Sequence, residues 1–313
     1  MIISCSRRTD IPALYADWLF TRVQEGFACV RNPMNHLQVS KIRLTPDVAD
    51  GFVFWTKNPA PMMPRLKELR DYAYYFQFTL TPYGKDIEPN LPVKIKLLNT
   101  FHRLSQQVGP RRVIWRYDPI LVNHNWSVDT HLRTFEMMAR LLEGTTHKVV
   151  ISFLDTDYRN VRRNRELLKA RELSAGEKLS MTGTLSQIAR SCGMEMSACA
   201  QELDLSSCGV APAHCVDGDL FETLLDCRLD LQKDRNQRPA CGCVQSADIG
   251  MYNSCTNACR YCYANDSASA IAKNRRSHNP ASPLLFGEIG QLDTVTERPM
   301  HSCKEQQMAL VGF

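Results

Sequence analysis

Short apolar runs alternate with amphipathic stretches along most of the chain. A short apolar run rich in β-branched or aromatic residues is typical of a buried strand, whereas apolar positions three and four apart indicate a helix. On this basis the sequence predicts strands at residues 2–6, 52–56, 74–80, 112–117, 148–153, 194–198, 248–252 and 283–286, with a further strand at 37–44.

The stretches between these runs carry the residues that usually begin and end helices. Proline suits a first helical turn, Ser followed three residues later by Glu forms a capping box, and glycine commonly ends a helix. The predicted helices therefore run from about Pro12 to Gly26, from Pro92 to Gly109, from Ser127 to Gly144, and from Ser174 to Arg190.

Strands that alternate with helices predict an α/β fold built on a mostly parallel sheet. About eight strands favour a complete or partial (β/α) barrel, with an open doubly wound sheet as the second choice. Residues 201–245 interrupt the alternation because they are polar and rich in cysteine. We expect residues 1–200 to form the main part of the barrel, 201–245 a small insert over its mouth, and 246–313 a C-terminal segment that completes it.

Composition narrows the class of protein only a little. Of the 313 residues, 44% are hydrophobic and 23% are charged, as in ordinary globular proteins. There is neither a signal-peptide pattern at the N-terminus nor an apolar run of roughly 18 residues, so we expect a cytoplasmic protein without a membrane partner. The net charge of +5 is mild. Basic residues such as Arg162, Arg163, Arg275 and Arg276 leave nucleic acid open as a partner without implying it.

Thirteen cysteines, an odd number, argue against a complete disulfide framework and favour metal ligands. The most informative are Cys255, Cys259 and Cys262, spaced Cys-x3-Cys-x2-Cys, with Tyr261 directly before the last. Protein thiolates usually supply four ligands to an iron–sulfur cubane, so three would leave one iron open. Zinc, which prefers four closed ligands, is the competing metal.

Four more cysteines could form a second metal site. Cys199, Cys215, Cys241 and Cys243 could supply four thiolates to an auxiliary iron–sulfur cluster or to zinc. Their irregular spacing leaves a second interpretation open, in which they are reduced, partly buried thiols.

Polar residues collect where the predicted strands give way to loops. In a parallel barrel the C-terminal strand ends form the active-site face. We therefore expect Arg7, Asp10, Lys57, Arg116 and Asp118 to face one pocket and to serve as catalytic or substrate-anchoring residues.

The cysteine spacing resembles that of the radical S-adenosylmethionine (SAM) enzymes. The resemblance implies that the open iron of a 4Fe-4S cluster takes the amino and carboxylate groups of SAM, and that a 5′-deoxyadenosyl radical attacks the substrate. It further implies that Tyr261 lies against the cofactor, that Gly287 and Glu288 contact it, and that a flavodoxin or ferredoxin supplies electrons.

Longer segments resemble the uncharacterised bacterial proteins called domain of unknown function 1848. The matching segments are residues 4–12, 54–59, 75–80, 115–119, 233–238, 241–243 and the cysteine run at 253–264. This resemblance implies cluster binding but gives no substrate. Because the cysteine run lies late in the chain, we expect a circularly permuted barrel whose first two strands are residues 248–252 and 283–286.

The sequence therefore supports one main hypothesis and two alternatives. The main hypothesis is a radical SAM enzyme that acts on an unknown substrate. The first alternative is a non-catalytic iron–sulfur or zinc protein. The second is an enzyme that modifies or repairs nucleic acid by radical chemistry.

Overall fold

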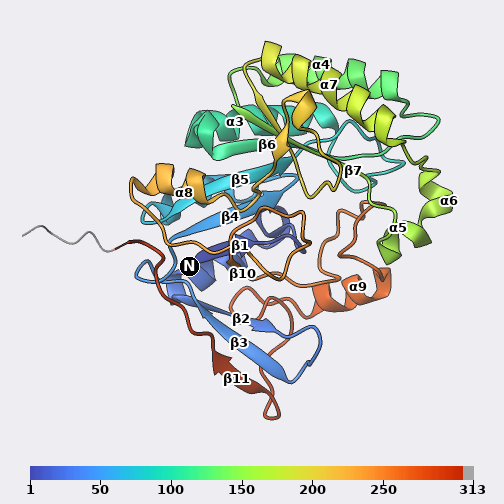
Figure 1. The fold of residues 1–313 in the computed structure, drawn as a ribbon. Coiled ribbons are helices and arrows are strands. Elements are labelled where there is room, and N and C mark those ends of the chain that lie inside the picture. Colours follow the sequence, from blue (N-terminus) through green and yellow to red (C-terminus); the bar gives the residue numbers. More distant parts are fainter. Residues whose placement is uncertain (306–313) are drawn as a thin grey trace, which may run out of the picture.

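Eight parallel strands form the main sheet in the computed structural model, which describes residues 1–305 (Figure 1). Their order is β10-β1-β4-β5-β6-β7-β8-β9. The strands are β1 (Ile2–Cys5), β4 (Gly51–Thr56), β5 (Ala73–Thr79), β6 (Val113–Ile120), β7 (Lys148–Phe153), β8 (Glu195–Ala198), β9 (Ala211–Pro212) and β10 (Ser246–Asp248). The predicted α/β class and parallel sheet are confirmed.

The helices follow the predicted boundaries closely. Ser127 caps one helix, Ser174 and Glu177 form the capping box of another, and Gly26 ends a third in the left-handed conformation, with φ of +77°. The helices are α1 (Ile11–Leu14), α2 (Ala16–Glu25), α3 (Lys94–Val108), α4 (Val128–Leu142), α5 (Arg159–Arg163), α6 (Arg165–Leu168), α7 (Ala175–Ser191), α8 (Gly218–Leu225) and α9 (Ala268–Arg276), with 3-10 turns η1 (Met63–Leu69), η2 (Pro110–Arg112) and η3 (Ser206–Cys208). None of the helices within residues 1–305 combines the length and apolar character that crossing a membrane requires.

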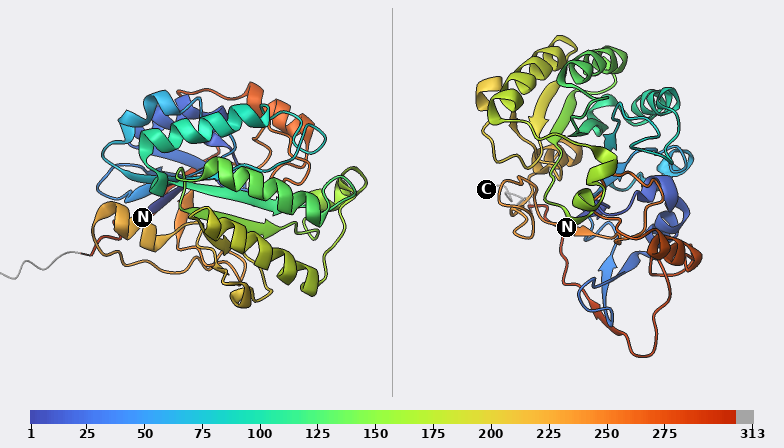
Figure 2. Two further views of the ribbon diagram at one scale, coloured as in Figure 1. Left: turned by 90° about the horizontal axis from the view of Figure 1, so that it is seen from above. Right: turned by 90° about the vertical axis from the view of Figure 1, so that its right-hand side faces the viewer.

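The two faces of the main sheet pack into two separate cores. Because successive side chains of a strand point to opposite faces, Phe52 and Phe54 join the larger core while Val53 joins the smaller one. Helices α2, α3, α4 and α7 cover the larger core. Residues 213–244 cover the other face, where Phe221 of α8 packs closely against Gly51. Figures 1 and 2 show α8 beside the sheet. Most of the predicted insert is therefore a layer against the sheet.

A second, three-stranded sheet lies beside the main one, at the bottom of Figure 1. It contains β2 (Phe27–Arg31), β3 (Gln38–Arg43) and β11 (Thr294–Glu297), in the order β11-β3-β2. The strand predicted at 37–44 thus exists, but in this smaller sheet.

Two late strand predictions need correction. The strand predicted at 248–252 is displaced, because β10 ends at Asp248 and a loop follows. The strand predicted at 283–286 is wrong, because Leu284 makes only an isolated bridge to Cys29 of the small sheet. Its apolar side chains are buried, but burial does not require a ladder of backbone hydrogen bonds. Only one C-terminal strand therefore joins the main sheet, beside β1.

The described strand pairs do not close into a ring, because β10 and β9 stand at opposite ends of the order within residues 1–305. The order from β1 to β9 rises steadily along the chain. A doubly wound sheet reverses its order at a switch point, and this sheet does not. The C-terminal strand ends consequently all lie along one rim.

Candidate functional site

A cavity of about 420 Å³ opens at the C-terminal ends of the main-sheet strands. Its size is within the range of small-molecule sites, roughly 300–1,000 Å³. Residues from β1, β4, β5, β6, β7 and β8, or from the loops directly after them, line it together with the 236–243 segment and the cysteine run. The five residues predicted to converge all reach it, namely Arg7, Asp10, Lys57, Arg116 and Asp118.

The cysteine run forms a folded loop after β10. Its ends are tied together, because the Asn253 amide donates to the Ala264 carbonyl at 2.9 Å. The Asn265 side chain accepts from the Ser254 amide at 3.2 Å and donates to the Cys255 carbonyl at 3.0 Å. The loop carries three thiols that all line the cavity, hereafter the triad: Cys255, Cys259 and Cys262.

A buried charge network fastens this loop to the rest of the cavity. Lys57 Nζ donates to Glu88 Oε1 at 2.8 Å and to the Tyr261 hydroxyl at 2.7 Å, and Tyr261 also donates to Glu88. Lys94 pairs with the second oxygen of Glu88. Burial alone would raise the Glu88 pKa, but the two lysines lower it to about 2. The network therefore holds Tyr261 by its hydroxyl.

Two carboxylates, the buried Asp10 and the partly buried Asp248, join the start of the loop to the end of β1. Asp10 accepts from the Lys57 amide at 2.8 Å and from Asn257 Nδ2 at 3.0 Å. Asp248 accepts from Ser6 Oγ at 2.6 Å and from Arg8 Nη2 at 2.9 Å. Burial opposes the ionisation of Asp248, yet Arg8 and the hydrogen bonds hold its pKa below the usual range. Asp10 and Asp248 thus set the position of the loop.

Glycine is required where β10 leaves the sheet. A methyl group on Gly250 would overlap the Ser6 side chain and stand 2.8 Å from Thr9 Oγ1. The loop can therefore pass beside β1 only without a side chain at this position.

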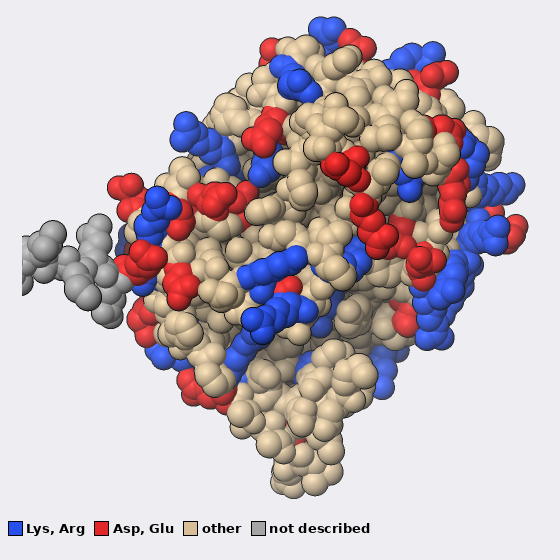
Figure 3. All heavy atoms as spheres, in the orientation of Figure 1, with Lys and Arg blue, Asp and Glu red and all other residues tan. Residues whose placement is uncertain are grey.

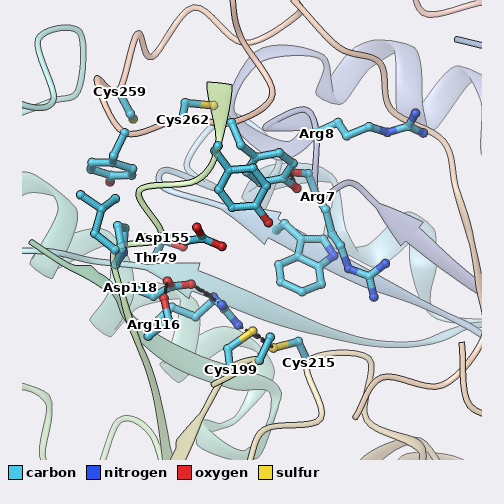
Figure 4. A pocket seen from close by; sticks show the side chains of 18 of the residues that line it. Arg7, Arg8, Thr79, Arg116, Asp118, Asp155, Cys199, Cys215, Cys259 and Cys262 are labelled. Carbon is cyan, nitrogen blue, oxygen red and sulfur yellow. Dashed lines mark hydrogen bonds and ion pairs between the residues drawn. The ribbon is translucent and has the colours of Figure 1, made fainter. Parts of the chain in front are cut away.

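Two arginines meet one tryptophan in the cavity wall. The guanidinium groups of Arg7 and Arg116 lie 5.3 and 5.2 Å from the centre of the Trp55 ring. Arg116 also donates to Asp118 through Nε at 3.1 Å, and Asp118 accepts from Ser152. Figure 4 shows Arg116 between Asp118 and a pair of cysteines. Arg116 therefore makes most of its hydrogen bonds with other residues of the protein.

The four further cysteines singled out in the sequence meet at the same wall. The Cys215 thiol donates to Cys199 Sγ at 3.4 Å, a contact marked in Figure 4, and Cys241 and Cys243 belong to the same packed cluster. They come from the end of β8, the loop after β9 and the 241–243 turn. We call these four residues the quartet, and all of them line the cavity.

The thiols are not arranged as a finished metal site. Within residues 1–305, no three His, Cys, Asp or Glu side chains surround a common point as a metal ion would require. Burial raises the pKa of Cys259 to about 12 and also raises that of Cys262. These triad thiols are consequently protonated at neutral pH unless a metal displaces the protons.

Not every predicted cofactor contact reaches the cavity. Gly287 donates its amide to the Ser277 carbonyl, and the carbonyl of the exposed Glu288 accepts from Arg31 beside the small sheet. Neither residue lines the cavity, whereas Tyr261 does.

Sequence reasoning also missed several residues of the site, including Glu88, Asp248 and Tyr263. Tyr263 lines the cavity, stacks on Tyr158 with ring centres 5.2 Å apart, and donates to the Arg7 carbonyl at 2.9 Å. Its place directly after the last triad cysteine was the one available indication. Glu88 stands in an irregular loop between a strand and a helix, where no periodic pattern marks it.

A comparison with protein-family models matches residues 2–264 to the model described as Domain of unknown function (DUF1848). The matched range includes β1 to β10, the quartet and the triad. A search of curated proteins finds no match.

Proposed function

The chain belongs to the DUF1848 family, whose function is unknown, and from the site itself we propose that it is a radical SAM enzyme. The observation that carries the proposal is the opening of all three triad thiols into the cavity at the strand ends. A cluster held there would face any molecule bound in the cavity. A cluster with a purely structural role would gain nothing from that position.

The donor set fits a cubane with one open iron. Three soft thiols stand on one short loop, and soft thiolates are the ligands that iron–sulfur clusters select. Cys255, Cys259 and Cys262 would each hold one iron. When bound and reduced, such a cluster supplies one electron to the sulfonium of SAM, which breaks a carbon–sulfur bond and yields methionine and a carbon radical.

The residues of the chain would position and shield the reactants. The Lys57–Glu88–Tyr261 network fixes the loop against the end of β4, with Tyr261 lining the cavity. The stacked pair Tyr158 and Tyr263 offers a second aromatic surface suited to adenine. Arg7 would anchor an anionic group, because its Nη2 is buried without a hydrogen-bond partner.

The sheet topology supports the same proposal. The strand order rises steadily from β1 to β9, as it would in a partial (β/α) barrel. Strand β10, which carries the triad loop, pairs with β1 at the head of this order. The placement agrees with a circular permutation in which one late strand supplies the first position.

Anaerobic reconstitution with iron and sulfide tests the proposal. Reduction in the presence of SAM should give 5′-deoxyadenosine, and Cys255→Ala, Cys259→Ala or Cys262→Ala should abolish it. Cys227→Ser is the matched control, since Cys227 is half-buried and does not line the cavity. A cluster confirmed spectroscopically that fails to cleave SAM would instead identify a non-catalytic iron–sulfur protein.

A second candidate, a radical enzyme that acts on nucleic acid, is favoured by the charge around the site. The side chains of Arg162, Arg163, Arg275 and Arg276 are exposed on α5 and α9. Arg163 of α5 donates to the carbonyl of Asp266, just before α9. Figure 3 shows basic residues gathered at the right-hand edge of the molecule, where α5 and α9 lie. Salt-dependent binding of an oligonucleotide, weakened by Arg162→Ala with Arg275→Ala, would support it. Binding that these changes leave unaltered would refute it.

A further inference from the structure

The quartet is a second cluster of thiols at the cavity wall. The sulfurs of Cys199 and Cys215 lie 3.4 Å apart, and Cys241 and Cys243 belong to the same packed cluster on this face of the sheet. The side chains come from three separate segments, so the fold, and not a short sequence repeat, gathers them. Cys215, Cys241 and Cys243 are nearly inaccessible to solvent.

Polar groups surround these sulfurs in a way that neutral thiols do not require. The Val216 amide donates to Cys243 Sγ at 3.3 Å, and Arg116 Nη1 donates to Cys215 Sγ at 2.9 Å. Arg7 lines the same cavity as these sulfurs. A thiol is a weak acceptor, whereas a metal-bound thiolate accepts such bonds strongly.

We propose that Cys199, Cys215, Cys241 and Cys243 bind one zinc ion in a closed four-thiolate site at the cavity wall. Four thiolates and one Zn²⁺ make a doubly negative centre. Arg116 places a positive charge against this centre, because its Nη1 donates to Cys215 Sγ at 2.9 Å.

The distance between the sulfurs of Cys199 and Cys215 favours zinc over a second cubane. Zinc–sulfur bonds of about 2.3 Å in a tetrahedron place the sulfurs roughly 3.8 Å apart. The 3.4 Å between Cys199 and Cys215 is close to this value. The thiolates of a cubane bind four different irons and stand farther apart. Since the four sulfurs do not surround one point as they stand, zinc would draw them together with release of their protons.

This site is independent of the proposed function, and the test keeps the two apart. Elemental analysis of the full chain after purification with zinc present, followed by removal of loosely bound metal, should give one zinc per chain. Cys215→Ser and Cys243→Ser should each lower the zinc content at least tenfold. Cys227→Ser and the triple triad variant should keep it, whatever the outcome of the SAM assay.

Cobalt provides a spectroscopic readout. Cobalt(II) added to the metal-free full-length triple triad variant should give intense visible bands of a tetrahedral site and thiolate-to-cobalt charge transfer, with an end point at one cobalt per chain. Zinc content unchanged in both quartet variants would overturn the proposal. So would a weak octahedral cobalt spectrum, or iron and sulfide bound at the quartet.

Discussion

Replacing Glu88 by Gln tests the network that fastens the triad loop. Glu88 is 1% exposed and meets Lys57 and Lys94. The fall of its pKa from 4.5 to about 2 corresponds to roughly 3 kcal/mol in favour of the ionised form. Removal of one partner from a buried ion pair costs about 3–5 kcal/mol, because the remaining charge is left unpaired. We therefore expect Glu88→Gln to destabilise the fold by about 3 kcal/mol at pH 7.

The pH dependence has a defined sign. Because the pKa of Glu88 is lower in the folded than in the unfolded state, its stabilisation is complete above about pH 4.5 and is lost as the pH falls through about 2. Urea unfolding of wild type and variant, followed by circular dichroism, should show a gap that narrows over this range. Glu136→Gln, at an exposed pair with Arg140, is the control and should change stability by less than about 1 kcal/mol. A gap at pH 7 no larger than the control's, or one that is independent of pH, would refute the reasoning.

Three further changes probe the surroundings of the cavity. Gly250→Ala should lower the free energy of unfolding by about 1–3 kcal/mol and reduce iron uptake on reconstitution, because the added methyl group overlaps Ser6. Gly176→Ala is the control: its methyl group would meet no atom within 4 Å, so thermal unfolding should be nearly unchanged. Asp217→Ala should lower the free energy of unfolding by about 1–2 kcal/mol, because the Asp217 side chain caps α8 and pairs with Lys148 of β7. It should also speed proteolysis within residues 201–245, and an unchanged cleavage rate would contradict this. Trp55→Leu should lower the melting temperature and weaken zinc retention, because the guanidinium groups of Arg7 and Arg116 lose their aromatic partner. An unaltered zinc content would disprove the effect on zinc.

The main sheet could be predicted because its strands carry strong local patterns. The run at β4, for example, is apolar on both faces, as a strand buried between two layers must be. The convergence of Arg116 and Lys57 followed from a general property of parallel sheets, whose C-terminal ends share one rim. Capping residues such as Ser174 marked helix ends because they act within a few residues of sequence.

The remaining features depend on contacts that local patterns do not encode. Strand β11 is exposed along its whole length, so no apolar periodicity reveals it. Leu284 and its neighbours are apolar and buried, yet they pack as a loop against the small sheet. Asp248 accepts from Ser6 and Arg8, which are at least 240 positions away, and Glu88 binds Tyr261 across 173 positions. Such partnerships exist only after the chain has folded.

The pairing of β10 with β1 has a consequence for the order of assembly during synthesis. A ribosome makes β1 and β4 through β8 well before residues 246–248 emerge, so the nascent sheet exposes the backbone of β1 as an open edge. Until Asp248 arrives, Arg8 and Ser6 also lack the carboxylate they bind. The sheet from β1 to β9 can therefore form before β10 is made, and β10 then covers the open edge of β1 and carries the triad loop that follows it.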